Sequence, residues 1–431
     1  MLSNRFRWVF CQLQSLRNCL PPSVRRALDE LPESLDATYE RVLEEIKKPN
    51  REHARRLLQC LVVAVRTLRV SELAEVLAVD FDDYEGIPKL KPNWRWEDEE
   101  QALLSSCSSL IAIVESDESR VVQFSHFSVK EFLTSARLAT SSGDISRYHI
   151  DLGHAHTILA QACMGVLLRS DDRVEESDVG NSSPLARYAA EHWIVHARDE
   201  MVSSCIRKAM EYLFDVDKPY FAAWLELYDI DTDTPSGTPF HMFAIRTGRG
   251  FPLYYAVRCG FQDLVKNLVR NDPNQVNATG GYFRAPLIAA LGGEHFQTAK
   301  FLYENGADVN ARMSDGSTPL HIAARIGRVE VIHELVKHGA DVNARKNDNT
   351  TTLHEAARSG SVEAIHVLLE HGVDVNARKT DDTTTLHEAA QSRSVEAVRV
   401  LFKNGVDVNA RSTGYIHTSE SDVFSGKHQS H

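Results

Sequence analysis

The 431-residue sequence is poor in cysteine, and its seven cysteines are widely scattered. No Cys-x-x-Cys pair occurs, and the last third of the chain has no cysteine at all. Structural zinc sites typically use closely spaced cysteine pairs, and disulfide frameworks are typical of short, cysteine-dense secreted chains. The pattern therefore indicates reduced, buried thiols in an intracellular protein, and we expect a cytoplasmic location.

Long apolar runs are missing as well. The longest strongly apolar stretch, residues 57–65, is interrupted by Gln59 and is less than half of the ~20 residues that cross a bilayer. Near the N-terminus, Arg5, Arg7 and Arg17 interrupt the apolar residues, so a signal-peptide core is absent. We expect no membrane association.

Positive charge is in deficit. The chain has 48 Lys and Arg against 60 Asp and Glu, a formal net charge of −12, so nucleic acid would meet a repulsive average field. Hydrophobic residues (43%) and charged residues (25%) are in the balance of a soluble globular protein. The length suggests about three domains at ~150 residues each.

Catalytic motifs are also missing. An NTPase needs a glycine-rich loop that ends in Gly-Lys-Ser/Thr, but the only Gly-Lys pair, Gly426-Lys427, is followed by His428. No Gly-x-Ser-x-Gly nucleophile elbow occurs. We therefore expect that the chain is not an enzyme and uses no cofactor.

Two histidine patterns are candidate metal sites. His354 and His387 each open a sequence that resembles the zinc protease motif, but Arg358 and Gln391 stand where the second histidine is needed. A further pair lies four residues apart on a predicted helix, with no third ligand: His192 and His196. We expect structural histidines and no metal.

A 33-residue period dominates the last third. Glycines recur at this spacing: Gly306, Gly339, Gly372 and Gly405. Leu-His pairs recur in the same register: Leu320-His321, Leu353-His354 and Leu386-His387. Such agreement indicates a stack of structural repeats.

Each period predicts two helices and a projecting hairpin. Pro319 sits early in the first helix, where its missing N–H costs little. The second helix carries an apolar stripe of Val329, Ile332, Leu335 and Val336. At the hairpin tips Gly316 is replaced by Asn349 and Asp382, which tolerate a positive φ.

The period and its Thr-Pro-Leu-His-x-Ala sequence resemble the ankyrin repeat. Two weaker copies precede it, so we expect about five repeats over residues 250–414 and a disordered tail over 415–431. In the final copy, Arg393 replaces the glycine between the helices, Gly327 and Gly360 in earlier copies. The last helix pair is therefore expected to fray.

The first 140 residues predict helices and one β-hairpin. Helices are expected at residues 4–20, 35–48, 52–65, 72–78 and 102–107, and strands at 110–114 and 121–124. Ser71 is a predicted N-cap, and Ser128 forms a predicted capping box with Glu131. Three helices followed by a hairpin is the winged-helix arrangement.

Three runs resemble one family: residues 6–13 (FRWVFCQL), 31–46 (LPESLDATYERVLEEI) and 124–133 (FSHFSVKEFL). They are similar to the helical end and winged helix of fungal NACHT-type signalling ATPases, in the form related to GPI inositol-deacylase-like proteins. Residues 188–198 (YAAEHWIVHAR) resemble the helical segment before the repeats of such proteins. The resemblance implies a nucleotide-binding core before Phe6, and this core is missing here.

The sequence thus predicts a mainly α protein. Its expected segments are 1–50, helical and following a missing core; 51–140, winged-helix-like; 141–249, a helical linker; 250–414, ankyrin repeats; and 415–431, a tail. The predicted function is protein–protein interaction. One alternative is a shortened signalling ATPase whose nucleotide-binding part lies upstream of Met1. The other is a DNA-binding regulator, which the acidic residues 97–100 before the third helix disfavour.

The predicted partner-binding surface combines hairpin tips with the exposed side of each first helix. In chain order it comprises Arg312, Ser314, Asp315, Ser317, Arg325, Ile326, Arg345, Asn347, Asp348, Thr350, Arg358, Ser359, Arg378, Thr380, Asp381, Thr383, Gln391 and Ser392. Some positions keep their residue from copy to copy, whereas others change chemistry. Arg325 and Arg358, one repeat apart, are the predicted anchors for another protein.

Overall fold

The computed structural model describes residues 34–81, 86–116, 119–141, 143–169, 183–232 and 251–413. The chain divides into two compact units, Met1–Pro235 and Ser236–His431, and is mainly helical as predicted. The predicted helix at residues 4–20 and the tail 415–431 lie outside the described residues. None of the described helices combines the length and the apolarity that crossing a membrane requires.

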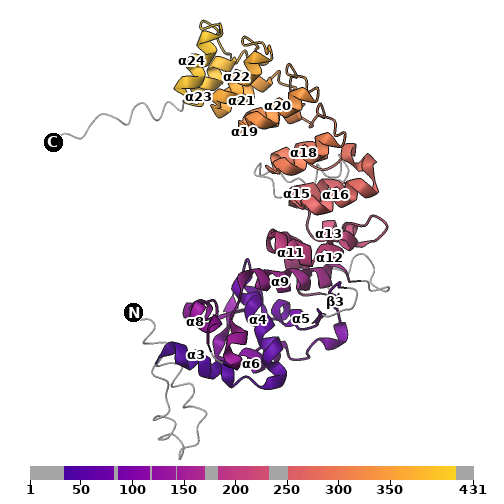
Figure 1. Cartoon of the computed structure of the whole chain (residues 1–431), viewed down its shortest axis with the longest axis vertical. Helices are drawn as coiled ribbons and strands as arrows, with labels where there is room; N and C mark the ends of the chain where they lie inside the picture. Colours follow the sequence, from indigo (N-terminus) through magenta and orange to yellow (C-terminus); the bar gives the residue numbers. More distant parts are fainter. Residues whose placement is uncertain are drawn as a thin grey trace, which may run out of the picture. The chain divides into compact units, whose positions relative to one another are not determined.

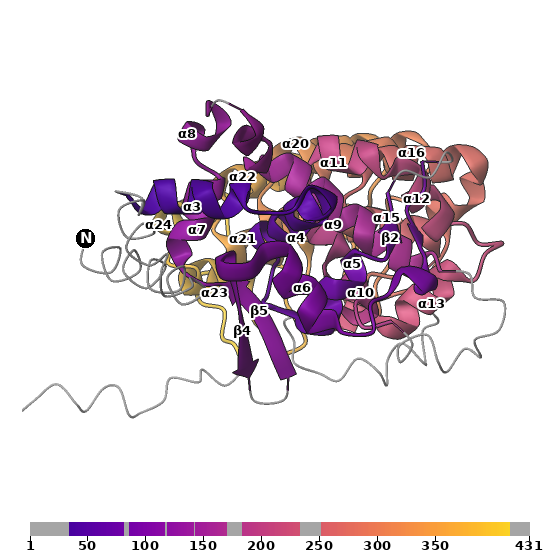
Figure 2. The same ribbon diagram turned by 90° about the horizontal axis from the view of Figure 1, so that it is seen from below.

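The first unit contains a winged helix. Its helices are α4 (Arg51–Val63), α5 (Val70–Val76) and α6 (Glu99–Cys107), and its strands are β1 (Leu68–Arg69), β4 (Ile111–Ser116) and β5 (Ser119–Phe124). The strands form an antiparallel sheet in the order β1-β5-β4, in which Leu68 pairs with Val122 and Ile111 with Phe124. Figure 2 shows β4 and β5 side by side. The predicted winged-helix arrangement is confirmed.

Three helix starts differ from the prediction. The N-cap of α5 is Arg69 and not Ser71, because the Glu72 carboxylate accepts the Arg69 backbone N–H at 2.7 Å. Helix α6 begins at Glu99 rather than near residue 102, because Asp98 accepts the N–H of Gln101 at 2.9 Å.

Ser128 is also not an N-cap. Helix α7 (Phe127–Leu133) is capped by His126, and Ser128 lies within the helix. Its hydroxyl lies 2.9 Å from the Tyr39 hydroxyl and 2.6 Å from the His126 ring, so tertiary partners take the group that the capping box needed. Tyr39 belongs to α3 (Leu35–Glu44), which ends before the predicted residue 48; Pro49 lies in the short helix η2 (Lys48–Asn50).

The helices after residue 150 belong to the first unit. They are α9 (Leu152–Leu167), α10 (Ala186–His196), α11 (Glu200–Cys205), α12 (Arg207–Leu213) and α13 (Tyr220–Leu227), together with α8 (Ala136–Ala139) before them. Helix α9 packs against α4, α10 and the ribbon of β2 (Val79–Asp80) and β3 (Lys89–Leu90) (Figure 1). The segment that the sequence suggested as a linker therefore contributes to the hydrophobic core of this unit. Trp193 and Trp224 are buried there, in an edge-to-face contact with their ring centroids 5.7 Å apart.

The cysteines are free thiols in the described part of the chain. Cys60, Cys107, Cys163 and Cys259 are buried as expected, and burial raises the pKa of Cys60 and Cys107 to about 12. Cys205 departs from the expectation, because it is exposed at the end of α11.

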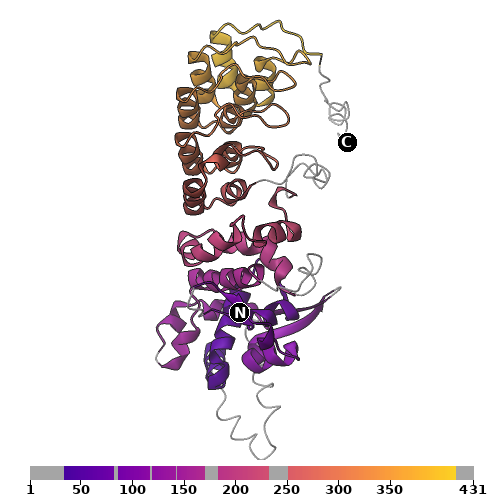
Figure 3. The ribbon, with the colours of Figure 1, turned by 90° about the vertical axis from the view of Figure 1, so that its right-hand side faces the viewer.

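The second unit contains five successive helix pairs. They are α15 (Pro252–Cys259) with α16 (Gln262–Asn271), α17 (Pro286–Gly292) with α18 (Phe296–Glu304), α19 (Pro319–Ile326) with α20 (Val329–Lys337), α21 (Thr352–Ser359) with α22 (Val362–Glu370), and α23 (Thr385–Gln391) with α24 (Val395–Lys403). Successive first helices pack on each other, and among the second helices α16 packs on α18, α20 on α22 and α22 on α24; Figure 3 shows the helices stacked. Neighbouring pairs thereby cover stripe residues such as Ile332 and Leu335, whereas Val395 and Phe402 of the last pair stay exposed.

Asparagine side chains join successive repeats. The Asn310 amide donates to the carbonyl of Gly339 at 3.0 Å, and its oxygen accepts the N–H of Asp341 at 2.8 Å. Asn277 and Asn376 make equivalent pairs of bonds one repeat before and two repeats after. Only the backbone of the next repeat takes part.

The backbone adopts a left-handed conformation at the predicted glycine positions between the two helices of a repeat. Gly327 and Gly360 end their helices at φ 74° and 71°, and Arg393 is held at φ 59° in the last repeat. A side chain favours this region far less than glycine does. Helix α23 also ends one residue early relative to α21, at Gln391.

Candidate functional site

The hairpin tips and first helices of the repeats expose most of the predicted partner-binding residues. Exposed members are Arg312, Ser314, Asp315, Arg325, Arg345, Asn347, Asp348, Arg358, Ser359, Arg378, Thr380 and Gln391, and partly buried ones are Ile326, Asp381 and Ser392. The structure corrects the prediction at three positions, which are buried: Ser317, Thr350 and Thr383.

These three residues are part of the hairpin framework. The Ser317 side chain donates to the Asp315 carboxylate at 2.7 Å, and Thr350 donates to Asp348 at 2.8 Å. Partial burial raises the pKa of Asp315, but the hydrogen bonds from Ser317 outweigh it and the net pKa is lowered. Each Asp therefore remains a charged acceptor that closes its hairpin, and the hydroxyl partner cannot reach another protein.

Two of the recurring arginines tie neighbouring tips together. Arg312 donates to the backbone carbonyl of Arg345 at 2.9 Å, and Arg345 donates to that of Arg378 at 3.5 Å. The contact between repeats thus explains why arginine recurs at this tip position. The residues at the varying tip positions, Ser314, Asn347 and Thr380, carry the differences between copies.

The histidine of each repeat has a structural role. The ring of His321 lies 2.9 Å from the Thr318 hydroxyl through Nδ1, and its Nε2 donates to the Thr350 carbonyl of the next repeat at 3.1 Å. His354 repeats this arrangement with Thr351 and Thr383. Burial lowers the pKa of both histidines to about 4, so the rings are neutral near pH 7.

An ionic network joins the last three repeats around two buried glutamates, and we call it the charge ladder: Lys346, Glu355, Arg358, Lys379 and Glu388. Lys346 Nζ lies 2.6 Å from Glu355 Oε1, and Arg358 makes two 3.0 Å bonds to Glu388, which Lys379 also contacts. Burial raises the pKa of Glu388, but the bonds from Arg358 and Lys379 outweigh burial and lower it overall.

Sequence reasoning missed four members of the charge ladder, although a signal was present. Lys346 and Lys379 are 33 residues apart, as are Glu355 and Glu388. Both glutamates follow a histidine and were considered only as parts of a zinc motif. A lysine and a glutamate that recur in register on a repeat are instead candidates for one ion pair per repeat.

Arg325 lies at the position equivalent to Arg358, one repeat earlier. The acid equivalent to Glu388 is Glu355, which contacts Lys346 at 2.6 Å and Arg358 at 3.7 Å instead. In its own repeat Ile322 stands where the later repeats have Glu355 and Glu388. Within the described residues, the Arg325 guanidinium is exposed and has no hydrogen bond or ion pair. It is therefore available to an external acceptor, whereas Arg358 is already engaged.

His192 and His196, the histidine pair of the first unit, have different neighbours. His196 lies 2.9 Å from the Tyr188 hydroxyl and 2.9 Å from His156, and burial lowers its pKa to about 3. His192 instead has Glu191 at 3.8 Å. The described residues contain no group of three or more side chains placed to hold a metal ion.

The third helix of the winged helix carries no Lys or Arg. Helix α6 runs from Glu99 to Cys107 and follows Glu97 and Asp98, so its exposed start is acidic. Arg120 of β5 is paired with Glu100. A recognition helix that approaches DNA phosphates needs the opposite charge.

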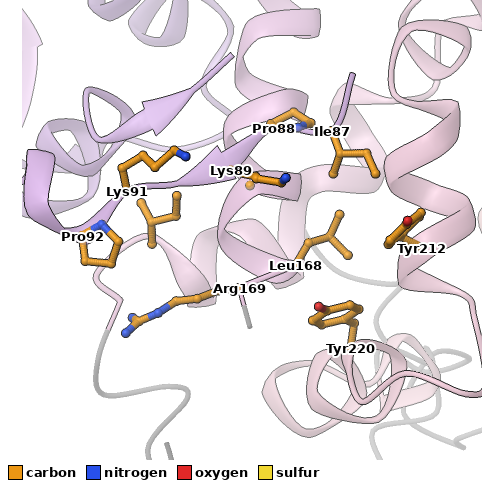
Figure 4. Close-up of a pocket in the computed structure, with 11 residues that line it drawn as sticks. Ile87, Pro88, Lys89, Lys91, Pro92, Leu168, Arg169, Tyr212 and Tyr220 are labelled. Atoms are coloured by element: carbon orange, nitrogen blue, oxygen red, sulfur yellow. The ribbon is translucent and has the colours of Figure 1, made fainter. Parts of the chain in front are cut away.

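The first unit also has a cavity of about 230 Å³ (Figure 4). Its lining includes the basic residues Lys89, Lys91 and Arg169 and the phenols Tyr212 and Tyr220, around Leu168. Asp80 lies 3.7 Å from Lys91. The lining residues include no carboxylate, histidine, serine or thiol.

Comparison with protein families agrees with both parts of this fold. Residues 253–346 and 343–412 match the family described as ankyrin repeats, and residues 39–143 match the winged helix domain of GPI inositol-deacylase. The chain contains ankyrin repeats and a winged helix domain.

Several proteins share part of this sequence. The chain is 29% identical over 297 residues to the azaphilone pigments biosynthesis cluster protein L of Monascus ruber, which covers 65% of this chain and 61% of that protein. It is 36% identical over 72 residues to alpha-latrocrustotoxin-Lt1a of Latrodectus tredecimguttatus, a match that covers 17% of this chain and 5% of the toxin. It is 34% identical over 101 residues to a neurogenic locus notch homolog of Xenopus tropicalis, a match that covers 23% of this chain and 4% of that protein. The chain spans less than two thirds of each relative's length.

Proposed function

We propose that this chain is a protein-interaction module that binds another protein through the tips and first helices of its ankyrin repeats. The observation that carries this is variation on a fixed scaffold. Buried threonines and histidines and the tip arginines recur to hold the repeats, whereas exposed neighbours change, as Ser314, Asn347 and Thr380 do. Repeats in general bind proteins on such a surface.

Arg325 is the anchor that we propose for this surface. Its guanidinium is exposed and has no acceptor in the described chain, so pairing with a partner's carboxylate would break no existing contact. Arg358, the other sequence-predicted anchor, would have to leave Glu388 or bind through its remaining exposed edge.

A wider context is proposed from the resemblance to fungal NACHT-type signalling proteins. In that context the repeats form the sensor part, and a nucleotide-binding part belongs to longer relatives. We propose that the described chain itself is not an enzyme, has no cofactor and acts in the cytoplasm without binding nucleic acid or membrane. The acidic start of α6 supports the part of this proposal that concerns nucleic acid.

The test starts from a partner captured with the full chain, with affinity measured for Arg325→Ala. We expect binding about tenfold weaker, the loss typical of one well-used arginine anchor. The matched control is Arg399→Ala, which removes the same charge from an exposed second-helix position. Unchanged affinity in Arg325→Ala, with binding lost on deleting residues 39–143, would move the interface to the winged helix.

The double variant Arg325→Ala and Arg358→Ala is less informative than the sequence suggested. Removing Arg358 strips Glu388 of a bidentate partner, so we expect a lower melting temperature as well as weaker binding. The single Arg325 variant separates the two effects.

A further inference from the structure

Two exposed tryptophans lie together in the first unit, in a stretch before α6 that we call the tryptophan segment, residues 92–98. Trp94 exposes 48% of its surface and Trp96 52%, whereas Trp193 and Trp224 are buried. Leaving large apolar rings in water forgoes about 25 cal/mol for each Å² that burial would remove. Tryptophan is also the residue type most enriched where proteins bind tightly.

The tryptophan segment is held in one conformation. The Arg95 guanidinium contacts the buried Glu75, whose other oxygen accepts bonds from Ser183 Oγ and the Leu185 N–H, both at 2.7 Å. The backbone at Arg95 is extended, with φ −64° and ψ 141°. Trp94 ends the short helix η3 before Arg95 and Trp96 follows it, and both indole rings are left exposed while Arg95 contacts Glu75.

This geometry presents the rings ready for contact. A partner would not have to order the segment on binding, because the Arg95 contact and the helix η3 (Pro92–Trp94) already do so. Pre-organisation of this kind lowers the entropic cost of association.

Acidic residues follow the rings directly in the chain, whereas Lys91 before the segment has Asp80 at 3.7 Å. Glu97 and Asp98 follow Trp96 directly and are exposed, and Glu99 and Glu100 come next. Asp98 caps α6 and Glu100 pairs with Arg120, but Glu97 has no ion pair among the described residues. Arg95, the cation within the segment, is turned toward Glu75.

We propose that the tryptophan segment is a second docking surface whose partner is a basic segment of another protein. An arginine or lysine side chain of the partner stacks on an indole face and its charge pairs with Glu97. Indole is the aromatic ring that binds cations best, and an adjacent carboxylate strengthens the contact. The same acids repel phosphates, which argues for a basic peptide and against DNA.

The probe for this surface is a fluorescein-labelled nona-arginine peptide, titrated into the full chain at physiological salt and followed by anisotropy. Replacing both rings, Trp94→Leu with Trp96→Leu, leaves the charge unchanged and is expected to weaken binding about tenfold. Replacing an exposed ring elsewhere, Phe402→Leu, is the matched control and leaves binding unchanged.

The charge is tested separately. Glu97→Gln is expected to weaken binding about fivefold, whereas Glu304→Gln, which removes one exposed charge from the repeats, has no effect. In the double-leucine variant three tryptophans remain, and the emission shift of the buried Trp193 and Trp224 on unfolding, with Trp8 as a constant background, reports whether the fold is intact. If that variant unfolds, the comparison of Glu97→Gln with Glu304→Gln still tests the proposal.

Equal affinity in the wild type and the double-leucine variant would show attraction by net charge alone and overturn the proposal. Binding of a labelled DNA duplex or of nona-glutamate that depends on the two rings would also contradict it. Arg325→Ala is expected to leave nona-arginine binding unchanged, which keeps this surface distinguishable from that of the repeats.

Discussion

Acidification from pH 7 to pH 5 is expected to destabilise the central ankyrin repeats. His321 and His354 are buried, and burial lowers the pKa of each ring from 6.5 to about 4. Below pH 6.5 the unfolded chain therefore binds protons that the folded chain does not, so stability falls as the pH falls from 6.5 toward 4. Protonation would create a buried cation and would place the proton on Nδ1, which accepts the backbone N–H of Thr318 in His321 and of Thr351 in His354.

The magnitude follows from these two pKa values. At pH 5, each unfolded histidine is almost fully protonated and each folded one is almost neutral, which costs about 2 kcal/mol per ring. Both together cost about 4 kcal/mol. With a urea dependence of about 2 kcal/mol per molar, the unfolding midpoint of the repeats should fall by about 2 M. The lowered pKa values of Asp315 and Asp348 act only at lower pH.

The assay must report on the repeats alone. The tryptophans all precede residue 225, so their fluorescence follows the first unit. Pulsed hydrogen exchange can follow the repeats separately. The chain is equilibrated in urea at pH 7 or pH 5 and labelled at one common pH, and deuterium uptake is measured in peptides from α19 to α22. The double variant His321→Gln with His354→Gln, which cannot titrate, is the control.

The wild-type midpoint should shift strongly with pH and the glutamine variant's far less. An equal shift in both proteins, or none in the wild type, would show that these rings do not carry the pH dependence.

Two further predictions concern stability. Glu388→Gln should destabilise the repeats by about 3 kcal/mol, because Arg358 and Lys379 lose their buried counter-charge, and urea unfolding of the variant beside the exposed control Glu396→Gln measures it. Arg393→Gly should stabilise the last repeat by about 1 kcal/mol, because glycine accepts φ 59° without strain. Hydrogen exchange in α24, expected to be the fastest of the second helices, should then slow; exchange already slower there than in α20 would refute the fraying argument.

The repeats could be predicted from sequence because one constraint is applied many times. The 33-residue register aligns glycine positions, apolar stripes and histidines, and each copy confirms the others. The positive φ at Asn349 and Asp382, 62° and 58°, was predictable for the same reason, since Gly316 occupies the equivalent place at φ 82°. Local preference and fold agree at these positions.

Several of the errors involve a partner far away in the sequence, whereas those at the starts of α5 and α6 involve the nearby carboxylates of Glu72 and Asp98. Ser128 reads as an N-cap locally, but Tyr39 and His126 take its hydroxyl. Thr350 reads as an exposed tip residue, but Asp348 and the ring of His321 draw it into the framework. Arg358 reads as free to bind, and Glu388, thirty residues on, holds it. Spacing alone carries no information about these partners.

The asparagine bridges between repeats bear on how the chain can change over generations. Asn277, Asn310 and Asn376 contact the neighbouring repeat through its backbone N–H and C=O, which every sequence provides. A duplicated or deleted 33-residue unit would meet the same acceptors and donors at its new junction. These bridges would therefore survive recombination that lengthens or shortens the array, and each added unit brings a fresh set of surface residues on which selection can act.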